Sequence, residues 1–174
     1  MAHSIIRPDR RQLIKGIGTT ALLAGLGAPF IARAQSDTVK IGHLTPLTGF
    51  LGPLGEYAQL GVQLAVEQLN ADGGINGKQI ELLMEDSVNP ATASTKAERY
   101  IKRDNVACII GEISSASGLA IAQVVERNSK LFFNTGCNSD ALRGSDCSRF
   151  MYHVEACNSQ YVKGVGSAFL RDGL

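Results

Sequence analysis

The chain has 174 residues, of which 17 are Lys or Arg and 16 are Asp or Glu. Five of the basic residues and one acidic residue lie within positions 1–34, so the rest of the chain carries a net charge of about −3. This balance excludes the basic surface that nucleic-acid binding requires, and the length suits one domain of ordinary size.

Residues 1–34 have the pattern of an export signal. Met1–Lys15 is basic, the apolar Gly16–Ile31 follows, and Ala32–Ala34 forms an A-x-A cleavage site. The run Asp9–Lys15 resembles the twin-arginine consensus, which predicts export by the Tat machinery, with general secretion as the alternative. The apolar run is shorter than the about 20 residues that span a bilayer. We therefore expect cleavage near Ala34 and a periplasmic mature protein.

The next segment predicts a strand, a helix and a returning strand. The first strand is expected at Thr38–His43, and Gly61–Asp86 contains most of the helix, a turn and the second strand, Gln79–Asp86. Gly73 and Gly74 end the helix, because glycine adopts the left-handed C-cap conformation without strain. One face of the helix is apolar at a spacing of three or four residues: Ala58, Val62, Ala65, Val66 and Leu69. A βαβ unit of this kind predicts a parallel sheet.

The alternation of strands and helices continues along the chain. Asn89-Pro90 predicts the N-cap and first residue of a helix that ends near Arg103. The further expected elements are a strand at Val106–Gly111, a helix from Ser114 to Asn128, a strand at Leu131–Asn134, an extended segment at Phe150–Val154 and a helix at Asn158–Asp172. The predicted fold is therefore α/β with a doubly wound parallel sheet, in which ligands bind at the carboxyl ends of the strands.

Small polar residues follow two neighbouring strands of this predicted sheet. Ser114 and Ser115 open a helix after the third strand, where free backbone N–H groups and the helix dipole favour a carboxylate. The loop after the fourth strand contains Gly136, Cys137 and Asn138. Together they predict a ligand site at this edge of the sheet. A plain helix cap and a plain turn are the alternative interpretations.

Beyond position 34 the sequence has no catalytic or metal-binding pattern. His43 and His153 lack metal-ligand spacing, so we expect structural roles for both. No G-x-S-x-G elbow or P-loop occurs, and we predict no catalytic residue, no metal and no cofactor. Glu112 either contacts a ligand or is solvated in a loop, whereas Phe50 and Tyr57 are expected to be packing residues.

The four cysteines permit one loop-closing disulfide. Cys108 lies within an apolar strand and is expected to be buried and unpaired. Cys137 and Cys147 bracket one loop, and an oxidising compartment favours a bond between them. Cys157 is a competing partner for either residue. No C-x-x-C occurs, which weakens a redox function.

Three segments carry a resemblance to a known family: KIGHLTPLTG, GVQLAVEQLNADGGINGKQIELLMEDS and VACIIGEISSASGLAIAQVVE. They are similar to the branched-chain amino-acid (leucine/isoleucine/valine) type of periplasmic solute-binding protein from ABC importers, over residues 38–172. The most specific patterns are A-V-E-x-x-N-A-x-G-G-I-N-G and the G-x-x-S-S helix start. The resemblance implies a type I periplasmic binding protein lobe of flavodoxin-like topology, within a protein of two lobes that close about a hinge.

The resemblance also implies roles for individual residues. Ser115 would hold the ligand carboxylate, and Gly136, Cys137 and Asn138 would add contacts. The family has an acidic residue near Asn158 that helps to hold an α-amino group, often threonine at Asn138, and an aromatic residue at Leu54. These departures leave an amide, a urea-like compound or an aromatic carboxylate open as the ligand.

The expected organisation is a signal peptide at 1–34, an N-terminal lobe at 35–154, and a hinge with the first helix of a truncated second lobe at 155–174. The expected function is capture of an amino acid or related small carboxylate or amide for an ABC permease in the inner membrane, after export by the Tat machinery and without nucleic acid. The alternatives are an exported α/β enzyme whose catalytic residues lie elsewhere and an exported ligand sensor of the same fold.

Overall fold

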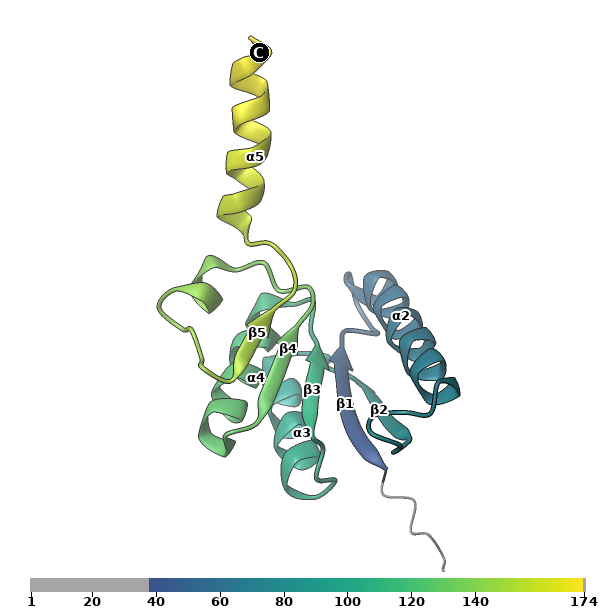
Figure 1. Ribbon diagram of the computed structural model, residues 1–174. Helices are drawn as coiled ribbons and strands as arrows, with labels where there is room; N and C mark the ends of the chain where they lie inside the picture. Colours follow the sequence, from purple (N-terminus) through teal and green to yellow (C-terminus); the bar gives the residue numbers. More distant parts are fainter. Residues whose placement is uncertain (1–37, 174) are drawn as a thin grey trace, which may run out of the picture. The chain divides into compact units, whose positions relative to one another are not determined.

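A computed structural model describes residues 38–173, so the predicted export signal lies outside the described residues. The elements are β1 (Val39–Thr45), α2 (Gly52–Ala71), β2 (Ile80–Asp86), α3 (Pro90–Lys102), β3 (Cys108–Gly111), α4 (Ser115–Asn128), β4 (Leu131–Asn134), the 3-10 helix η1 (Asp140–Arg143), β5 (Met151–His153) and α5 (Asn158–Arg171). Every predicted strand and helix is present, with ends that shift by a few residues (Figure 1).

The five strands form one parallel sheet in the order β2-β1-β3-β4-β5. Strand order reverses direction between β1 and β3, because the chain moves outward from β1 to β2 and then returns past β1 to β3. This is the flavodoxin-like order, whose ligand site lies at the switch point. The predicted doubly wound α/β fold is confirmed.

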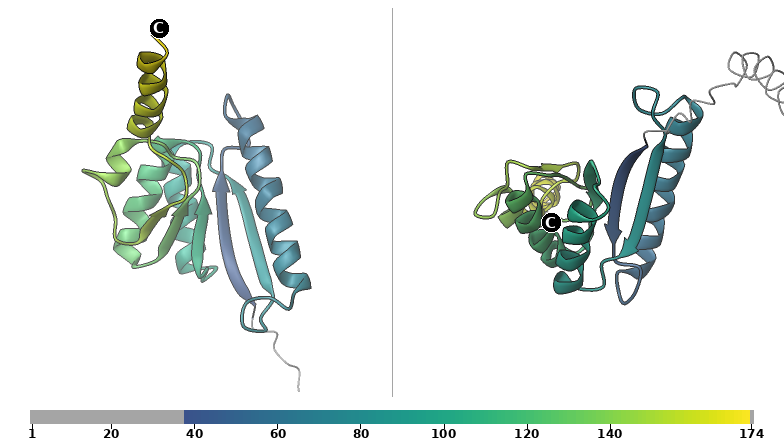
Figure 2. Two further views of the ribbon diagram at one scale, coloured as in Figure 1. Left: turned by 45° about the horizontal axis from the view of Figure 1, so that its top comes forward. Right: turned by 90° about the horizontal axis from the view of Figure 1, so that it is seen from below.

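Helices cover both faces of the sheet. A Cβ on Gly42 of β1 would lie 2.5 Å from the Tyr100 ring of α3, whereas Thr45 of the same strand faces Gly55 of α2. Because successive residues of a strand point to opposite faces, α3 and α2 lie on opposite sides. α4 packs beside α3, and α2 covers β1 and β2 (Figure 2).

The apolar core fills the layer between the sheet and the α3–α4 face. Its fully buried members include Leu44, Tyr100, Val106, Ile109, Ile121, Val124, Val125, Phe132 and Leu142. The opposite face is buried less completely, since on that face α2 covers β1 and β2. Of the apolar face predicted for α2, Ala58, Val62 and Val66 are half-buried, but Ala65 and Leu69 are exposed. Two residues of the predicted apolar face are therefore left exposed among the described residues.

Local chemistry explains where the helices begin and end. The Asn89 Oδ1 atom accepts the Thr92 N–H at 2.9 Å, so the predicted N-cap of α3 is confirmed. Gly73 and Gly74 follow α2 with φ of 99° and 77°, a region that side chains rarely adopt. No side chain of α5 is buried among the described residues. Within the described part of the chain, no helix combines the length and apolarity needed to cross a bilayer.

Candidate functional site

A cavity of about 390 Å³ lies at the carboxyl ends of β1, β2 and β3, at the switch point of the sheet. Its lining residues come from three connections: Pro46, Thr48, Gly49, Phe50 and Leu51 after β1; Ser87, Val88, Asn89 and Pro90 after β2; Ser114 and Ser117 at the start of α4. Hollows of about 470 and 500 Å³ lie along α3 and beside β2, lined largely by long charged side chains. The switch-point cavity has the position and size expected of a small-molecule site.

The cavity presents hydrogen-bond donors. The N-termini of α3 and α4 both border it, through Asn89-Pro90 and Ser114. Ser114 is the N-cap of α4, yet its hydroxyl accepts no capping hydrogen bond. Ser87 is only 1% exposed, and its Oγ has no partner within residues 38–173. A buried hydroxyl without a partner is costly, so the Ser87 Oγ and the helix N-termini are groups that a ligand in this cavity would hydrogen-bond.

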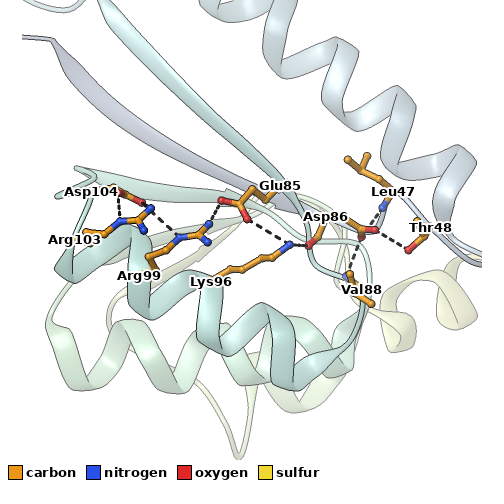
Figure 3. A network of polar contacts seen from close by, with 9 residues as sticks. All are labelled: Leu47, Thr48, Glu85, Asp86, Val88, Lys96, Arg99, Arg103 and Asp104. Atoms are coloured by element: carbon orange, nitrogen blue, oxygen red, sulfur yellow. Dashed lines mark hydrogen bonds and ion pairs between the residues drawn. The ribbon is translucent and has the colours of Figure 1, made fainter.

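Asp86 holds two walls of the cavity in place (Figure 3). Its carboxylate accepts the N–H groups of Leu47 and Val88 at 2.9 Å each and the Thr48 hydroxyl at 2.7 Å. Burial would raise the pKa of Asp86, but these hydrogen bonds and the Lys96 charge outweigh it and lower the pKa. The ionised carboxylate therefore joins the loop after β1 to the loop after β2.

The helix α3 is fixed to the end of β2 by charged groups of the same network. Lys96 Nζ donates to the Asp86 carbonyl at 2.7 Å and lies 3.4 Å from a Glu85 carboxylate oxygen (Figure 3). Arg99 pairs with the same carboxylate. The N-terminus of α3 is thereby held beside the cavity.

The predicted site residues beyond Ser114 form a strip that leads from the cavity to α5. Ser115 Oγ accepts the Ser139 N–H at 3.2 Å. Asn138 Nδ2 donates to the Ala156 carbonyl at 3.1 Å, and the Asn138 carbonyl accepts the Asn158 N–H at 2.8 Å. Ser115, Asn138 and Asn158 thus lie close together, but none of them lines the cavity itself.

Asn134 shapes the loop after β4. Its Oδ1 accepts the N–H groups of Gly136 and Cys137 at 3.2 and 2.8 Å, and its Nδ2 donates to the Cys137 carbonyl at 3.0 Å. A Cβ on Gly136 would lie 3.0 Å from the Glu112 carbonyl, so this loop passes close to the end of β3. Glycine suits position 136 because a side chain there would crowd the Glu112 carbonyl. The buried Asn134, which shapes this loop, was not among the predicted site residues.

Cys137 does not present its side chain to the cavity, so a ligand contact through its sulfur has no support here and stays a prediction. It is fully buried, and its Sγ contacts the carbonyls of Glu112 and Ser114 at 3.3 and 3.4 Å. A Cβ on Gly118 of α4 would approach the sulfur to 2.5 Å. Both backbone groups of Cys137 are bound by Asn134. Cys137 is therefore a packing residue beneath the start of α4.

The predicted disulfide between Cys137 and Cys147 is not formed. All four cysteines, which lie within the described residues, are free: Cys137 and Cys157 are buried, Cys108 is half-buried and Cys147 is exposed. The sulfur of Cys137 lies under α4, whereas the Cys147 side chain borders a separate surface hollow beside Glu126 and Arg127. Spacing along the loop did not reveal that its ends face different environments.

This arrangement predicts selective thiol chemistry. In the folded protein without reductant, a maleimide is expected to label Cys147 and to leave Cys137 unmodified, because burial excludes the reagent and raises the pKa of the Cys137 thiol. Peptide mapping by mass spectrometry, before and after unfolding, measures both. Labelling of neither residue until a disulfide is reduced would restore the bond predicted from sequence.

Both histidines have structural contacts. His43 is fully buried, with Nδ1 3.1 Å from the Ile110 carbonyl. His153 Nδ1 accepts from Asn134 at 2.9 Å and Nε2 donates to Leu142 at 3.1 Å. Burial lowers the pKa of each imidazole, so both are neutral at neutral pH. These contacts agree with the predicted structural roles.

Two aromatic predictions were wrong. Phe50 is 97% exposed at the rim of the cavity, and Tyr57 is also exposed, so neither packs within the described residues. Leu54, the position at which the family resemblance implied an aromatic side chain over the ligand, is exposed on α2 and does not line the cavity. Phe50, together with Leu51 and Val88, adds apolar groups to the lining of the cavity.

The loop after β2 and the acidic residues near α5 were not among the predicted site residues. The pattern Asp86-Ser87 followed by the Asn89-Pro90 helix start places polar groups after the second strand, and that signal was available. Asp140 accepts hydrogen bonds from the Ser159 N–H and hydroxyl, while Glu155 accepts from Tyr161. Hydrogen bonds from Ser159 and Tyr161 lower the pKa of Asp140 and Glu155 respectively. Two ionised carboxylates therefore lie beside Asn158.

Comparisons with known proteins agree with this geometry. The sequence model described as "Periplasmic binding protein" matches residues 38–173. The chain is similar to Leu/Ile/Val-binding protein homolog 7 of Brucella melitensis, 36% identical over 72% of this chain and 30% of that protein. It is also similar to homolog 8 of Brucella abortus, 39% identical over 71% of this chain and 30% of that protein. The chain thus spans about a third of the length of these curated relatives.

Solved structures give the same result. A periplasmic binding protein from Burkholderia mallei matches with a TM-score of 0.70 at 30% identity, over 79% of this chain and 37% of that chain. A branched-chain amino acid transporter substrate binding protein from Streptococcus pneumoniae, solved with isoleucine, matches with a TM-score of 0.66 at 26% identity, over 72% and 38%. The chain therefore belongs to the periplasmic binding protein family and is a relative of the branched-chain amino-acid substrate-binding proteins of ABC transporters.

Proposed function

We propose that this chain forms a ligand-binding lobe of the periplasmic component of an ABC importer. The observation that carries the proposal is the switch-point cavity, where the N-termini of α3 and α4 meet the unpartnered hydroxyl of Ser87. Such a site suits the anionic end of an amino acid or of a related small carboxylate, or the polar end of an amide. Its chemistry is binding rather than catalysis.

In the proposed mechanism, backbone N–H groups at the start of α4 and the hydroxyls of Ser114 and Ser115 hold the ligand carboxylate. A second lobe closes over the ligand about a hinge near Asn158, and the closed form docks on an inner-membrane permease. Tat export would deliver the folded protein to the periplasm, with the signal removed near Ala34.

We infer that a positive group of the ligand is held near the start of α5. Asn158 supplies no charge, but the ionised Asp140 and Glu155 both precede it in the chain and contact the first turn of α5. This favours an amino acid among the possible ligands, despite the missing acid at position 158. The Streptococcus relative that holds isoleucine supports the same class.

Isothermal titration of the full-length protein tests this function. The panel contains leucine, isoleucine, valine, glutamine, urea and benzoate. Saturable binding of one of them, with the ligand recovered unchanged, is the expected result. Steady product formation would contradict it and support the exported enzyme. A ligand that binds without stimulating uptake by the permease would support the sensor.

Removal of the site hydroxyls is expected to weaken binding. Ser114→Ala and Ser115→Ala should each lower the affinity by about 1–3 kcal/mol, because each removes a hydrogen bond to a charged group. Ser114→Ala is the cleaner variant, since Ser115 Oγ also accepts the Ser139 N–H. The exposed Ser145, outside the cavity, is the control: Ser145→Ala should bind as the wild type does. Unchanged affinity in both site variants would remove this edge from the ligand site.

A further inference from the structure

Glu112 is a fully buried carboxyl group directly behind the proposed site, and its two oxygens differ. It follows Gly111, the last residue of β3, and is 0% exposed. Its Oε1 accepts the N–H groups of Ile113 and Ser114, each at 3.0 Å. Its Oε2 has no partner among residues 38–173. Glu112 is therefore not solvated in a loop, which was one of the two roles that the sequence suggested.

Two buried hydroxyls near Glu112 also lack partners. Thr45 ends β1 and Ser87 follows β2, so the three residues occupy the carboxyl ends of three neighbouring strands. Each hydroxyl belongs to a residue that is 1% exposed, and neither has a hydrogen bond in the described part of the chain. The Ser87 hydroxyl lies near enough to favour the ionised form of Glu112, but Ser87 Oγ and Glu112 Oε2 are not hydrogen-bonded to each other. When Glu112 is protonated on Oε2, its O–H therefore has the unused Ser87 hydroxyl oxygen nearby as an acceptor.

The surroundings make a negative charge on Glu112 expensive. Burial raises the pKa of Glu112, and the charge of Asp86 raises it further, against the nearby Ser87 hydroxyl and the hydrogen bonds from the Ser114 and Ile113 N–H groups, which lower it. The other titratable neighbours do not supply a compensating cation. The Cys137 thiol is held neutral by burial, His43 on β1 is neutral, and Lys96 on α3 is engaged by Asp86 and Glu85.

We propose that Glu112 is a positioning residue that takes up a proton when a carboxylate binds at the N-terminus of α4. The inference rests on the proposed function. An ionised Glu112 uses the Ser114 N–H, one of the donors that a ligand anion would approach, and it repels that anion. Protonation removes the repulsion and leaves Oε1 in place to fix the turn. The lobe therefore captures its anion together with a proton.

The sign of the pH dependence follows from this coupling. A bound carboxylate raises the pKa of Glu112 above its value in the free protein, so between the two values binding takes up as much as one proton. Within that window affinity falls as pH rises, by at most about tenfold per pH unit. Below and above the window affinity is independent of this group.

Calorimetry with isoleucine and with benzoate tests the proposal on the full-length protein. Titrations at several pH values from 5.5 to 8, in phosphate and in Tris, separate proton uptake from binding through the different ionisation enthalpies of the buffers. Wild type should take up protons. Glu112→Gln, which keeps the shape and the Oε1 acceptor, should lose both the uptake and the pH dependence. Glu81→Gln, which changes a partly exposed carboxylate on β2 beside Lys40, is the control and should behave as wild type does.

Each result decides the proposal. Binding without proton uptake in wild type, or equal uptake in Glu112→Gln, would overturn the role of Glu112 and leave the proposed function intact. If neither probe nor any other carboxylate of the panel binds, the proposed carboxylate function fails, and the coupling fails with it.

A second measurement needs no ligand. Because the pKa of Glu112 is raised in the folded state, its contribution to stability is present at low pH and is lost as pH rises through the folded pKa. Gln does not titrate, so Glu112→Gln should raise Tm more at pH 8 than at pH 5. An equal change at both pH values would show that Glu112 does not change its protonation in this range, and would contradict the proposal.

Discussion

Phe132→Ala is expected to lower the free energy of unfolding by about 3–5 kcal/mol, the largest single-residue effect that we predict. Phe132 lies in β4 and is fully buried in the core between the sheet and α4. Removing its ring loses the transfer free energy of the ring atoms and leaves a cavity that packed neighbours fill only in part. Urea or guanidinium denaturation of the full-length protein, analysed at constant m value, measures the loss.

Phe133→Ala is the matched control for this prediction. Phe133 is the next residue of the same strand and points to the opposite face, where its ring stacks on Tyr152 with centroids 5.7 Å apart. That face is half-buried, so the same substitution should cost clearly less than at Phe132. Equal losses at the two positions would contradict the assignment of the main core to the α3–α4 side.

Gly55→Ala is expected to destabilise the protein by about 1–3 kcal/mol, although alanine is the better helix former. Gly55 lies in the second turn of α2, where a Cβ would come within 1.7 Å of the Pro46 carbonyl oxygen. The obstacle is backbone, so it can move away only if the loop after β1 moves with it. Because Pro46 lines the cavity, ligand affinity should fall together with stability.

The same helix contains the control. Gly61 of α2 has no atom within 4 Å of an added Cβ, so Gly61→Ala should stabilise the protein by about 0.5–1 kcal/mol through propensity alone. Thermal and chemical denaturation of the two variants compare one substitution in one helix. A gain in stability at both positions would show that α2 does not press on the loop after β1.

The order of elements was predictable because local signals agreed with the final fold. Asn89-Pro90 marks the start of α3, Gly73 and Gly74 mark the end of α2, and Leu131–Asn134 is β4 to the residue. Each signal depends on backbone conformation or a nearby side chain, so it can be recognised within a few residues of sequence. The alternation of these elements predicted the α/β class and the family resemblance implied the flavodoxin-like topology, and the strand order confirms both.

The site was only partly predictable, because strand order decides which loops meet. Placing β1 between β2 and β3 brings Ser87 and Thr48 into the cavity beside Ser114, whereas chain order had directed attention to the loops after β3 and β4. Burial was equally hidden. Cys137 and Glu112 occur in polar loops of the sequence, but close approach of α4 and of Gly136 encloses both. Ser115, Asn138 and Asn158 remain predictions as ligand contacts.

The attachment of α5 has a mechanical consequence. None of its side chains is buried among the described residues, and its first turn is held by the Asn138 backbone and by Asp140. A helix of 14 residues is about 21 Å long, so its far end moves several times farther than its base when the base rotates. Asn138 and Asp140 therefore form the pivot of α5. A small rotation at the loop after β4 would displace Arg171 farther than it displaces the first turn of the helix.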